Sequence, residues 1–218
     1  MSGFGTRRLI ARSTKIICVG RNFADHAKEL GNAVPTEPFF FLKPPSSLLL
    51  SGAIEKPPQV TDLHFEVELG VLIGTGGRDI TKGKAMSHIA GYVLALDMTA
   101  RCVQEAAKAK RLPWTIAKGF DTFCPISKVV PGRKVADPQS LDLWLKVDGQ
   151  LRQQGNTRDM IFSIADQIAF LSQRMSLTPG DLILTGTPAG VGAVQVGQVI
   201  TAGLESGGKS LGMACVDR

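Results

Sequence analysis

The sequence predicts a single α+β domain that is mainly β and carries a few short helices. The chain has 24 glycines among its 218 residues, above the share of roughly 7% that is typical of proteins. Many short apolar runs lie between these glycines, a pattern typical of strands joined by tight turns. Two longer segments show the spacing of amphipathic helices. Composition alone also allows an all-β domain, and 44% apolar residues are enough for a large core.

The first two elements are a strand at residues 15–20 and a short helix at residues 23–30. KIICVG is an apolar run with β-branched residues, which favours a strand. Asn22 can cap the helix FADHAKEL, and Gly31 can end it in a left-handed conformation. A proline-rich connection at residues 41–52 leads to the next strand.

Residues 62–74, DLHFEVELGVLIG, predict a strand that places two glutamates on one face. Polar and apolar residues alternate in its first half, so Glu66 and Glu68 point to the same side. Residues two apart lie about 6.7 Å apart along a strand, where two anions repel by roughly 2.5 kcal/mol at an effective dielectric near 20. A solvated face would offset this repulsion, and so would a divalent cation between the carboxylates.

A third carboxylate, Asp97, ends the strand predicted at residues 91–98. It follows the apolar run VLAL, where an unpaired acid is costly to bury. Asp97 can cap the next helix, and it can also join Glu66 and Glu68 if the two strands are neighbours. Such an all-oxygen set suits Mg²⁺ or Mn²⁺ before Zn²⁺. His64 shares the face of the glutamates, but a lone histidine there is more often structural.

Two helices are expected in the second half of the chain. Residues 99–112 give the strongest helical pattern, with Thr99 or Asp97 at its start and Pro113 just beyond its end. Residues 160–175 form a second amphipathic pattern.

The remaining elements are strands. Residues 141–155 predict a hairpin, because Asp148-Gly149 suits a type I′ turn between two alternating runs. Further strands are expected at residues 181–188, 198–204 and 210–216.

The segment GLESGGKS, residues 203–210, matches the letters of a phosphate-binding loop but not its context. Such a loop ends a strand and opens a helix, whereas only eight residues follow Ser210 and their pattern is that of a strand. We interpret SGGK as a turn between the last two strands. GTGGRD at residues 74–79 lacks the final glycine of a dinucleotide-binding loop and is also interpreted as a turn.

His26 and Glu29 form a candidate general-base pair. They lie three residues apart on the predicted helix and so face the same way. Glu29 can accept a hydrogen bond from His26 and thereby fix the tautomer of the imidazole. Taken alone, the motif is also compatible with an incidental pair on a surface helix.

Charge and hydropathy exclude several classes of partner. The net charge is +6 and the sequence pI about 9.3, but lysines and arginines are scattered singly and aromatic residues are few, so we expect no nucleic-acid binding. The positive balance suits steering of small anions. No apolar run approaches the roughly 20 residues of a membrane span. The cysteines contain no C-x-x-C pair and are expected to be the reduced thiols of an intracellular protein. They are Cys18, Cys102, Cys124 and Cys215.

Residues 1–14 are expected to precede a single catalytic domain that spans residues 15–218. The first fifteen residues hold four basic residues and several hydroxyl residues but no acid, as does the end of a mitochondrial transit peptide. An ordinary flexible terminus on a cytoplasmic protein is the alternative.

Six stretches, in this order, resemble the fumarylacetoacetate hydrolase family. They are ICVGRNFADHAKEL, HFEVELGVLIG, YVLALDMTAR, WTIAKGFDTFCPI, QGNTRDMIF and LILTGTPAGVG, and the resemblance runs from about Lys15 to Val216. It is closest to the short, single-domain members that act as acylpyruvate hydrolases and oxaloacetate decarboxylases, some also as oxaloacetate tautomerases. It implies a mixed β-sandwich roll, usually a homodimer, that acts on a small 2-oxo acid.

The resemblance also implies roles for nine residues. The ligands of Mg²⁺ or Mn²⁺ would be Glu66, Glu68 and Asp97. The catalytic residues would be His26 and Glu29, on a segment that can order as a lid, and Lys118. The residues lining the substrate pocket would be Arg101, Gln104 and Thr187.

The sequence departs from the family pattern at two positions. Phe23 stands where tyrosine is common, and Cys102 stands where aspartate is common. Neither change removes a metal ligand or a member of the dyad, so both bear on lid ordering and fine specificity.

Three reactions fit these residues. A cation held by three carboxylates keeps positions for the carboxylate and 2-oxo oxygens of a substrate. Hydrolysis of an acylpyruvate would use water activated by His26, whereas decarboxylation of oxaloacetate needs no attacking water. Tautomerisation of oxaloacetate needs only proton transfer at the same carbon, so the sequence leaves all three open. A non-catalytic metal-binding protein would share the carboxylates but would have no need of the dyad.

Overall fold

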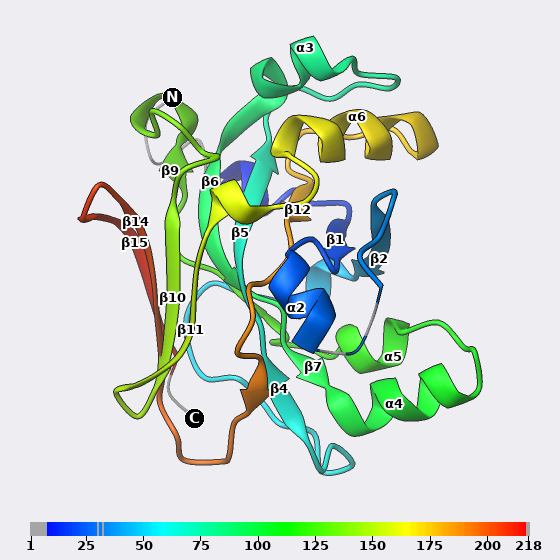
Figure 1. The fold of residues 1–218 in the computed structure, drawn as a ribbon, viewed down its shortest axis with the longest axis vertical. Helices are drawn as coiled ribbons and strands as arrows, with labels where there is room; N and C mark the ends of the chain where they lie inside the picture. Colours follow the sequence, from blue (N-terminus) through cyan, green and yellow to red (C-terminus); the bar gives the residue numbers. More distant parts are fainter. Residues whose placement is uncertain (1–7, 30, 32, 217–218) are drawn as a thin grey trace.

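The computed structural model describes residues 8–29, 31 and 33–216 and shows two packed β-sheets with short helices around them (Figure 1). The larger sheet has six strands in the order β2-β1-β12-β5-β6-β9. These strands are β2 (Phe39–Lys43), β1 (Ile16–Gly20), β12 (Leu182–Leu184), β5 (Val67–Ile73), β6 (Ile89–Leu96) and β9 (Val130–Pro131). β1 and β12 run parallel, and the other neighbours are antiparallel, so the sheet is mixed as expected.

The smaller sheet is antiparallel and has four strands in the order β11-β10-β14-β15. They are β10 (Asp142–Val147), β11 (Gln150–Asn156), β14 (Ile200–Ser206) and β15 (Lys209–Val216). Asp148 and Gly149 both have positive φ, 48° and 77°, which confirms the predicted type I′ turn. Gly207 and Gly208 form the equivalent turn between β14 and β15 with φ of 55° and 76°, so SGGK is a hairpin turn and not a phosphate-binding loop.

Two minor sheets complete the β structure and correct one prediction. They contain β13 (Gly192–Ala193), β4 (Leu63–Phe65) and β7 (Thr99–Ala100), and β3 (Leu48–Leu49) with β8 (Cys124–Pro125). The strand expected over residues 62–74 is two strands, because β4 leaves the large sheet to pair with β7 and β13. The break falls at Glu66.

The helices are short. They are α2 (Ala24–Glu29), α3 (Lys82–Ala85), α4 (Arg101–Ala109), α5 (Thr115–Lys118) and α6 (Ile164–Arg174), with 3₁₀ turns η1 (Pro45–Ser47), η2 (Met86–His88), η3 (Gly132–Lys134) and η4 (Thr157–Asp159). The helix predicted over residues 160–175 starts later, at Ile164, because Ser163 and Asp166 form a capping box there.

Two predicted caps are wrong. Asn22 does not cap α2 but joins the loop before α6: its amide accepts from the Phe162 N–H at 2.8 Å and donates to the Phe162 and Thr185 carbonyls at 3.1 and 2.8 Å. The N-cap of α4 is Ala100, without a side-chain hydrogen bond. Thr99 lies in β7 and Asp97 turns towards other partners, so neither caps α4.

The large sheet is buried on both faces. Leu69, Val71 and Leu94 pack in the core between the two sheets, together with residues of β10, β14 and α6. Leu72 and Val93 point to a second, smaller core on the opposite face. Because side chains alternate along a strand, Glu68 and Asp97 share the face of this second core, at the end of β5 and β6.

The N-terminal segment lies against the second core. Ile10 is buried there, and Asp181 binds Lys15 Nζ at 2.5 Å and Thr14 Oγ1 at 2.7 Å. Residues 1–7, which contain half of the expected targeting segment, lie outside the described residues. The domain boundary at residue 15 stays a prediction.

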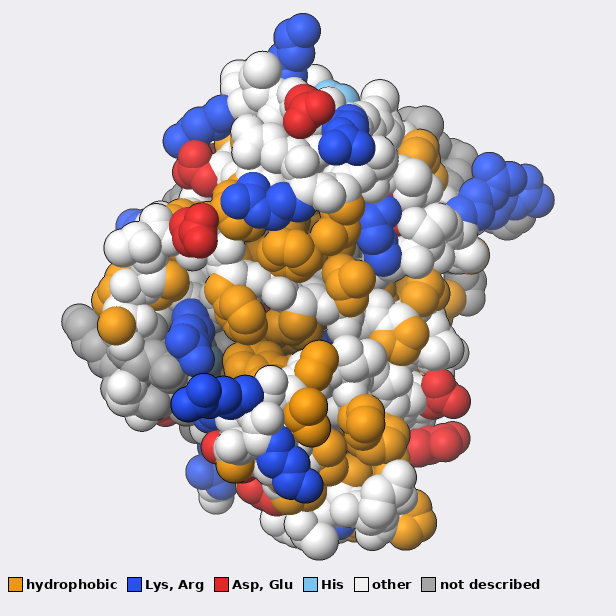
Figure 2. Space-filling view, turned by 90° about the vertical axis from the view of Figure 1, so that its right-hand side faces the viewer, with side chains coloured by type: hydrophobic (Ala, Val, Ile, Leu, Met, Phe, Trp, Pro, Cys, Tyr) orange, Lys and Arg blue, Asp and Glu red, His pale blue; other side chains and the backbone are white. Residues whose placement is uncertain are grey.

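The molecular surface has one face with many apolar side chains. Figure 2 shows them across the middle of the face that carries β2 and α5, with lysine and arginine side chains around them. Phe39 on β2 is 40% exposed and Ile116 on α5 is 71% exposed.

Over the part of the chain that is described, none of the helices has the length and apolar character needed to cross a membrane. Cys18, Cys102 and Cys124 are free thiols.

Candidate metal centre and active site

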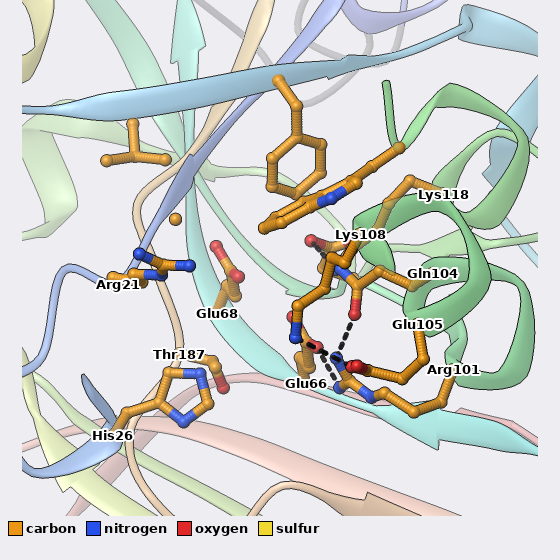
Figure 3. A pocket seen from close by; sticks show the side chains of 15 residues that line it. Arg21, His26, Glu66, Glu68, Arg101, Gln104, Glu105, Lys108, Lys118 and Thr187 are labelled. Carbon is orange, nitrogen blue, oxygen red and sulfur yellow. Dashed lines mark hydrogen bonds and ion pairs between the residues drawn. The ribbon is translucent and has the colours of Figure 1, made fainter. Parts of the chain in front are cut away.

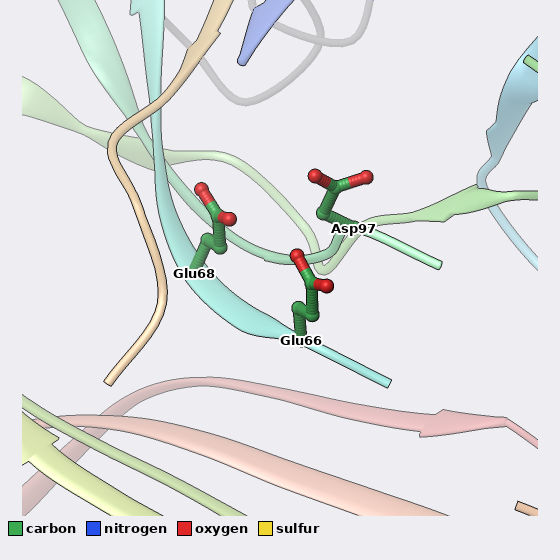
Figure 4. Close-up of side chains that lie close together, drawn as sticks. All are labelled: Glu66, Glu68 and Asp97. Carbon is green, nitrogen blue, oxygen red and sulfur yellow. The ribbon is translucent and has the colours of Figure 1, made fainter. Parts of the chain in front are cut away.

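Three buried carboxylates converge where β5 and β6 meet (Figure 4). Glu66 joins β4 to β5, Glu68 lies in β5, and Asp97 follows β6. One oxygen from each lies within 4.8 Å of the others. β5 and β6 pair with Glu68 opposite Ala95, and the Asp97 amide donates to the Glu66 carbonyl at 2.8 Å. The two strands are therefore neighbours, as the sequence analysis required for Asp97 to join Glu66 and Glu68.

Three cations offset the charge of these carboxylates. Lys118 Nζ lies 2.9 Å from Glu66 Oε2 and 2.8 Å from Asp97 Oδ2. Arg101 Nη2 lies 2.6 Å from Glu66 Oε1. Lys43 Nζ lies 2.8 Å from Asp97 Oδ1. The centre thus holds as many cationic as anionic side chains.

The carboxylates do not ionise equally. Burial raises the pKa of Glu68 well above its usual range, and the charges of Asp97 and Glu66 raise it further. Burial opposes ionisation of Glu66 as well, but Lys118 and Arg101 outweigh burial and lower the Glu66 pKa to about 2. Burial works against the charge of Lys118, yet Asp97 and Glu66 raise its pKa above the usual value, so its ammonium stays protonated. Glu68 is therefore the carboxylate that gains most from an additional positive charge.

The donor set fits a hard divalent cation. All three donors are carboxylate oxygens, the ligands that such ions prefer. A cation would take the place of the proton that the raised pKa of Glu68 favours. Asp97 Oδ1 is buried and, among the described residues, receives no hydrogen bond, so this acceptor has an unused lone pair.

His26 and Glu29 form a hydrogen-bonded pair beside the carboxylates. His26 Nδ1 lies 3.3 Å from Glu29 Oε2, and His26 is 5% exposed. The Gly190 amide donates to both Glu29 oxygens at 3.1 and 3.2 Å. Glu29 thus connects α2 to the loop after β12, and among the described residues the second ring nitrogen of His26 has no hydrogen-bond partner.

A single pocket brings the predicted residues together (Figure 3). Its lining contains every predicted site residue except Glu29, which contacts His26 Nδ1. Arg101 Nη1 donates to Gln104 Oε1 on the same helix. Thr187 Oγ1 accepts from Gln153 Nε2 at 2.8 Å, and Gln153 Oε1 accepts from the Val67 N–H at 2.9 Å. Sequence reasoning missed Gln153, a buried side chain that orients Thr187 from β11.

Lys43 is a second residue that the sequence analysis missed. It is fully buried at the end of β2, and its Nζ donates to three backbone carbonyls at 2.5 to 3.0 Å, those of Met98, Lys118 and Phe123. All three N–H groups of the Lys43 ammonium are thereby used. Lys43 therefore forms an ion pair with Asp97 Oδ1 without donating a hydrogen bond to it. A lysine directly after FFFL was the signal in the sequence.

His64 lies outside the carboxylate trio. Its Nε2 lies 3.1 Å from Asp62 Oδ2, and burial, followed by the charge of Arg101, lowers its pKa. This placement agrees with a structural histidine.

Comparisons with known proteins agree with this architecture. Residues 15–213 match the model of the family described as fumarylacetoacetate (FAA) hydrolase, C-terminal. The chain is 58% identical over 192 residues to the mitochondrial oxaloacetate decarboxylase of Dictyostelium discoideum, covering 87% of this chain and 88% of that protein. It is 58% identical over 199 residues to a mitochondrial oxaloacetate tautomerase of Arabidopsis thaliana, covering 91% of this chain and 89% of that protein.

A solved structure gives the same result for the fold. The fumarylpyruvate hydrolase from Pseudomonas aeruginosa, in complex with Mn²⁺ and pyruvate, superposes with a TM-score of 0.89 at 37% identity. The match covers 94% of this chain and 89% of that one. The mixed, mainly β fold expected from the sequence is confirmed.

Proposed function

Because the chain belongs to the fumarylacetoacetate hydrolase family, we propose that it is a divalent-metal-dependent enzyme that acts on small 2-oxo acids, foremost oxaloacetate. Relatives named oxaloacetate decarboxylase and oxaloacetate tautomerase, each 58% identical, support this substrate. One observation carries the proposal: three buried carboxylates within 4.8 Å open into the same pocket as His26 and Lys118.

Glu66, Glu68 and Asp97 would hold the cation, Mg²⁺ or Mn²⁺. When bound, such an ion would polarise a carbonyl group of the substrate. A 2-oxo acid would suit this site, because its carboxylate and 2-oxo oxygens lie on adjacent carbons.

The protein side chains would supply the charge and the proton. Protonated Lys118 lies beside the carboxylates and would stabilise negative charge that develops on the 2-oxo oxygen. His26, oriented by Glu29, would move a proton at C3, which interconverts keto and enol oxaloacetate. Loss of CO₂ from C3 passes through the same electron distribution, so one site serves tautomerisation and decarboxylation. Arg101, Gln104 and Thr187 would orient the substrate.

Hydrolysis of acylpyruvates is a second candidate. The His26–Glu29 pair favours it, because an imidazole oriented by a carboxylate can activate water. The likeness to a fumarylpyruvate hydrolase points the same way. The product would be pyruvate and a carboxylic acid.

A substrate comparison tests the proposal. The purified protein is incubated with enol oxaloacetate, keto oxaloacetate and acetylpyruvate, each with Mg²⁺ and with a chelator. Ultraviolet absorbance follows the enol, and coupled detection follows pyruvate. We expect metal-dependent turnover of oxaloacetate above a control with Mg²⁺ alone. No turnover of any of the three substrates would exclude the proposed function.

Substitutions at the dyad separate the reactions. His26→Ala should lower acylpyruvate hydrolysis by about 10²- to 10⁴-fold, the usual contribution of a general base, and lower decarboxylation less because no water attacks. Glu29→Gln should give a milder form of the same pattern, while Glu55→Gln on the surface should change neither rate. Steady-state kinetics at saturating Mg²⁺ measure both. Equal rates for wild type and His26→Ala would show that His26 is not the general base, and Lys118 would then be the candidate for that role.

The compartment and assembly are part of the proposal. Relatives with more than half of their residues identical are named mitochondrial, so we propose that residues 1–14 belong to a targeting segment and that the catalytic domain starts near residue 15. A reporter fused to residues 1–14 tests this by its location. We further propose a homodimer, which light scattering after gel filtration measures directly.

A further inference from the structure

Four lysine and arginine side chains line the pocket, and one of them differs from the rest. Lys118 and Arg101 pair with the carboxylates of the metal centre. Lys108 Nζ lies 2.9 Å from Glu105 Oε1. Arg21 also lines the pocket, but among the described residues no carboxylate lies within ion-pairing distance of its guanidinium. Its charge is available to a ligand.

The backbone at Arg21 has an unusual conformation. Arg21 follows β1 directly and has a φ of 57°, in the left-handed region that side chains other than glycine rarely adopt. The adjacent Gly20 does not take this conformation, although glycine would do so without strain. Strained backbone of this kind is maintained at some ligand-binding sites, and among the described non-glycine residues with positive φ only Arg21 lines the pocket.

The next residue holds this conformation in place. Asn22 is fully buried, and its side chain makes three hydrogen bonds to Phe162 and Thr185. Its carbonyl accepts from the Ile161 N–H at 2.8 Å. The chain is therefore fixed immediately after Arg21, and the direction of the Arg21 side chain is set by the fold.

The Arg21 side chain is supported from one side. Its Cζ lies 5.9 Å from the centre of the Phe39 ring, within the range of a cation–π contact. Gly20 makes room for that ring, because a Cβ there would lie 2.8 Å from Phe39 Cδ1. Figure 3 shows Arg21 and His26 on one side of the carboxylates, with Arg101 and Lys108 on the other.

The charge balance of the pocket identifies the missing partner. The side chains of Glu66, Glu68 and Asp97 are balanced by Lys43, Lys118 and Arg101. A divalent cation would add two positive charges, and Arg21 adds a third. A 2-oxo diacid would offset more of this excess than a monoacid, and its second carboxylate would need a cation beyond the chelated end.

We propose that Arg21 is the specificity residue that binds the second carboxylate of a four-carbon 2-oxo diacid, an inference that rests on the proposed function. A guanidinium pairs with a carboxylate through two parallel hydrogen bonds, which gives both affinity and direction. A substrate so held has its C3 between Arg21 and the chelating centre, on the side of the pocket where His26 lies. A monoacid of the same length lacks this contact.

Kinetics with matched ligands test the assignment. Arg21→Met should lower kcat/KM for oxaloacetate by about 10- to 100-fold, the usual effect of removing one charge-assisted hydrogen-bonded contact. The same variant should change kcat/KM for acetylpyruvate by less than about 3-fold, because acetylpyruvate has no second carboxylate. The Ki of 2-oxobutyrate, which is oxaloacetate with a methyl group in place of that carboxylate, should also stay unchanged.

Two variants control for other effects. Arg21→Lys keeps the charge but not the two parallel hydrogen bonds of a guanidinium, so it should recover only part of the loss. Arg111 has the same backbone conformation, with a φ of 56°, but is exposed outside the pocket, so Arg111→Met should leave all three constants at the wild-type values.

The outcomes separate this inference from the proposed function. Unchanged kcat/KM for oxaloacetate in Arg21→Met, or equal losses for oxaloacetate and acetylpyruvate, would overturn the assignment and leave the proposed function standing. A wild-type protein in which oxaloacetate neither reacts nor competes with 2-oxobutyrate would overturn both.

Discussion

At the scale of single residues, Lys43 holds together the backbone segments around the carboxylates. Its ammonium connects the segments that carry Asp97, Lys118 and Phe123, and it is fully buried. The three carbonyls and the nearby Asp97 thus share one cationic side chain. Burying an ammonium is costly unless every donor is used, and here every donor is used.

We therefore expect Lys43→Met to destabilise the fold by about 3–5 kcal/mol, the usual cost of removing one partner from a buried ion pair. Lys82→Met is the control, because Lys82 pairs with Asp166 at the surface with 66% of its side chain exposed, and such pairs contribute about 1 kcal/mol or less. Urea unfolding of the metal-free protein measures both. Similar losses for the two variants would contradict the role given to Lys43.

The sequence predicts the carboxylate trio but not its support. Glu66 and Glu68 can be predicted as neighbours because side chains two residues apart in a strand lie on the same face. Asp97 can be predicted because an acidic residue ends an apolar run. Lys43 and Arg21 carry no such local pattern. Their importance arises from carbonyls and charges that come from distant segments and meet only in the folded protein.

At the scale of elements, the hairpin strands β10 and β14 fit together through a glycine. Gly203 lies opposite Trp144, and a Cβ at this position would overlap the indole ring. Trp144 Nε1 in turn donates to Glu205 Oε1 at 2.8 Å. The ring thus lies flat across the neighbouring strand, which is why this strand contains a glycine.

Gly203→Ala should destabilise the protein by about 1–3 kcal/mol, because the ring has to move to accommodate the methyl group. The matched control is Gly83→Ala in α3, where a Cβ meets nothing within 4 Å. This control should be neutral or stabilising by up to about 1 kcal/mol, since alanine favours a helix. Denaturant unfolding compares the two, and equal effects would refute the packing argument.

The elements themselves were largely predictable, and the exceptions have a common cause. The turn at Asp148-Gly149 is specified by residues that tolerate positive φ. The existence of α6 follows from its amphipathic pattern, although the helix starts at Ile164 and not at residue 160. The break at Glu66 and the partners of Asn22 were not predictable. In both cases a segment far away in the sequence competes for the backbone or side chain: β7 and β13 for β4, and the loop before α6 for Asn22.

At the scale of the whole molecule, the buried carboxylates should make stability depend on pH. Burial and two neighbouring carboxylates raise the pKa of Glu68 in the folded, metal-free protein. A raised folded-state pKa gives stability that is fully present below the ordinary pKa of the carboxyl group. That stability is lost as the pH rises through the raised value.

The metal-free protein should therefore lose stability through this group as the pH rises above the ordinary pKa of a glutamate side chain towards the raised pKa of Glu68. Glu68→Gln removes this component, so its pH profile should be flatter than that of the wild type, and Mg²⁺ should abolish the loss in the wild type only. Thermal unfolding at several pH values with a chelator and with Mg²⁺ gives both comparisons. Parallel profiles for the two proteins in the chelator would show that Glu68 is not the group involved.

The centre holds equal numbers of anionic and cationic side chains. This balance determines whether the protein can fold before it binds a metal ion. Glu66 and Asp97 have partners within the chain, and Glu68 can carry a proton, so the fold does not need a cation to form. Assembly of the chain and loading of its metal are then two separate events. If the proposed function holds, a newly made molecule folds before it binds the cation and becomes active only after the cation has bound.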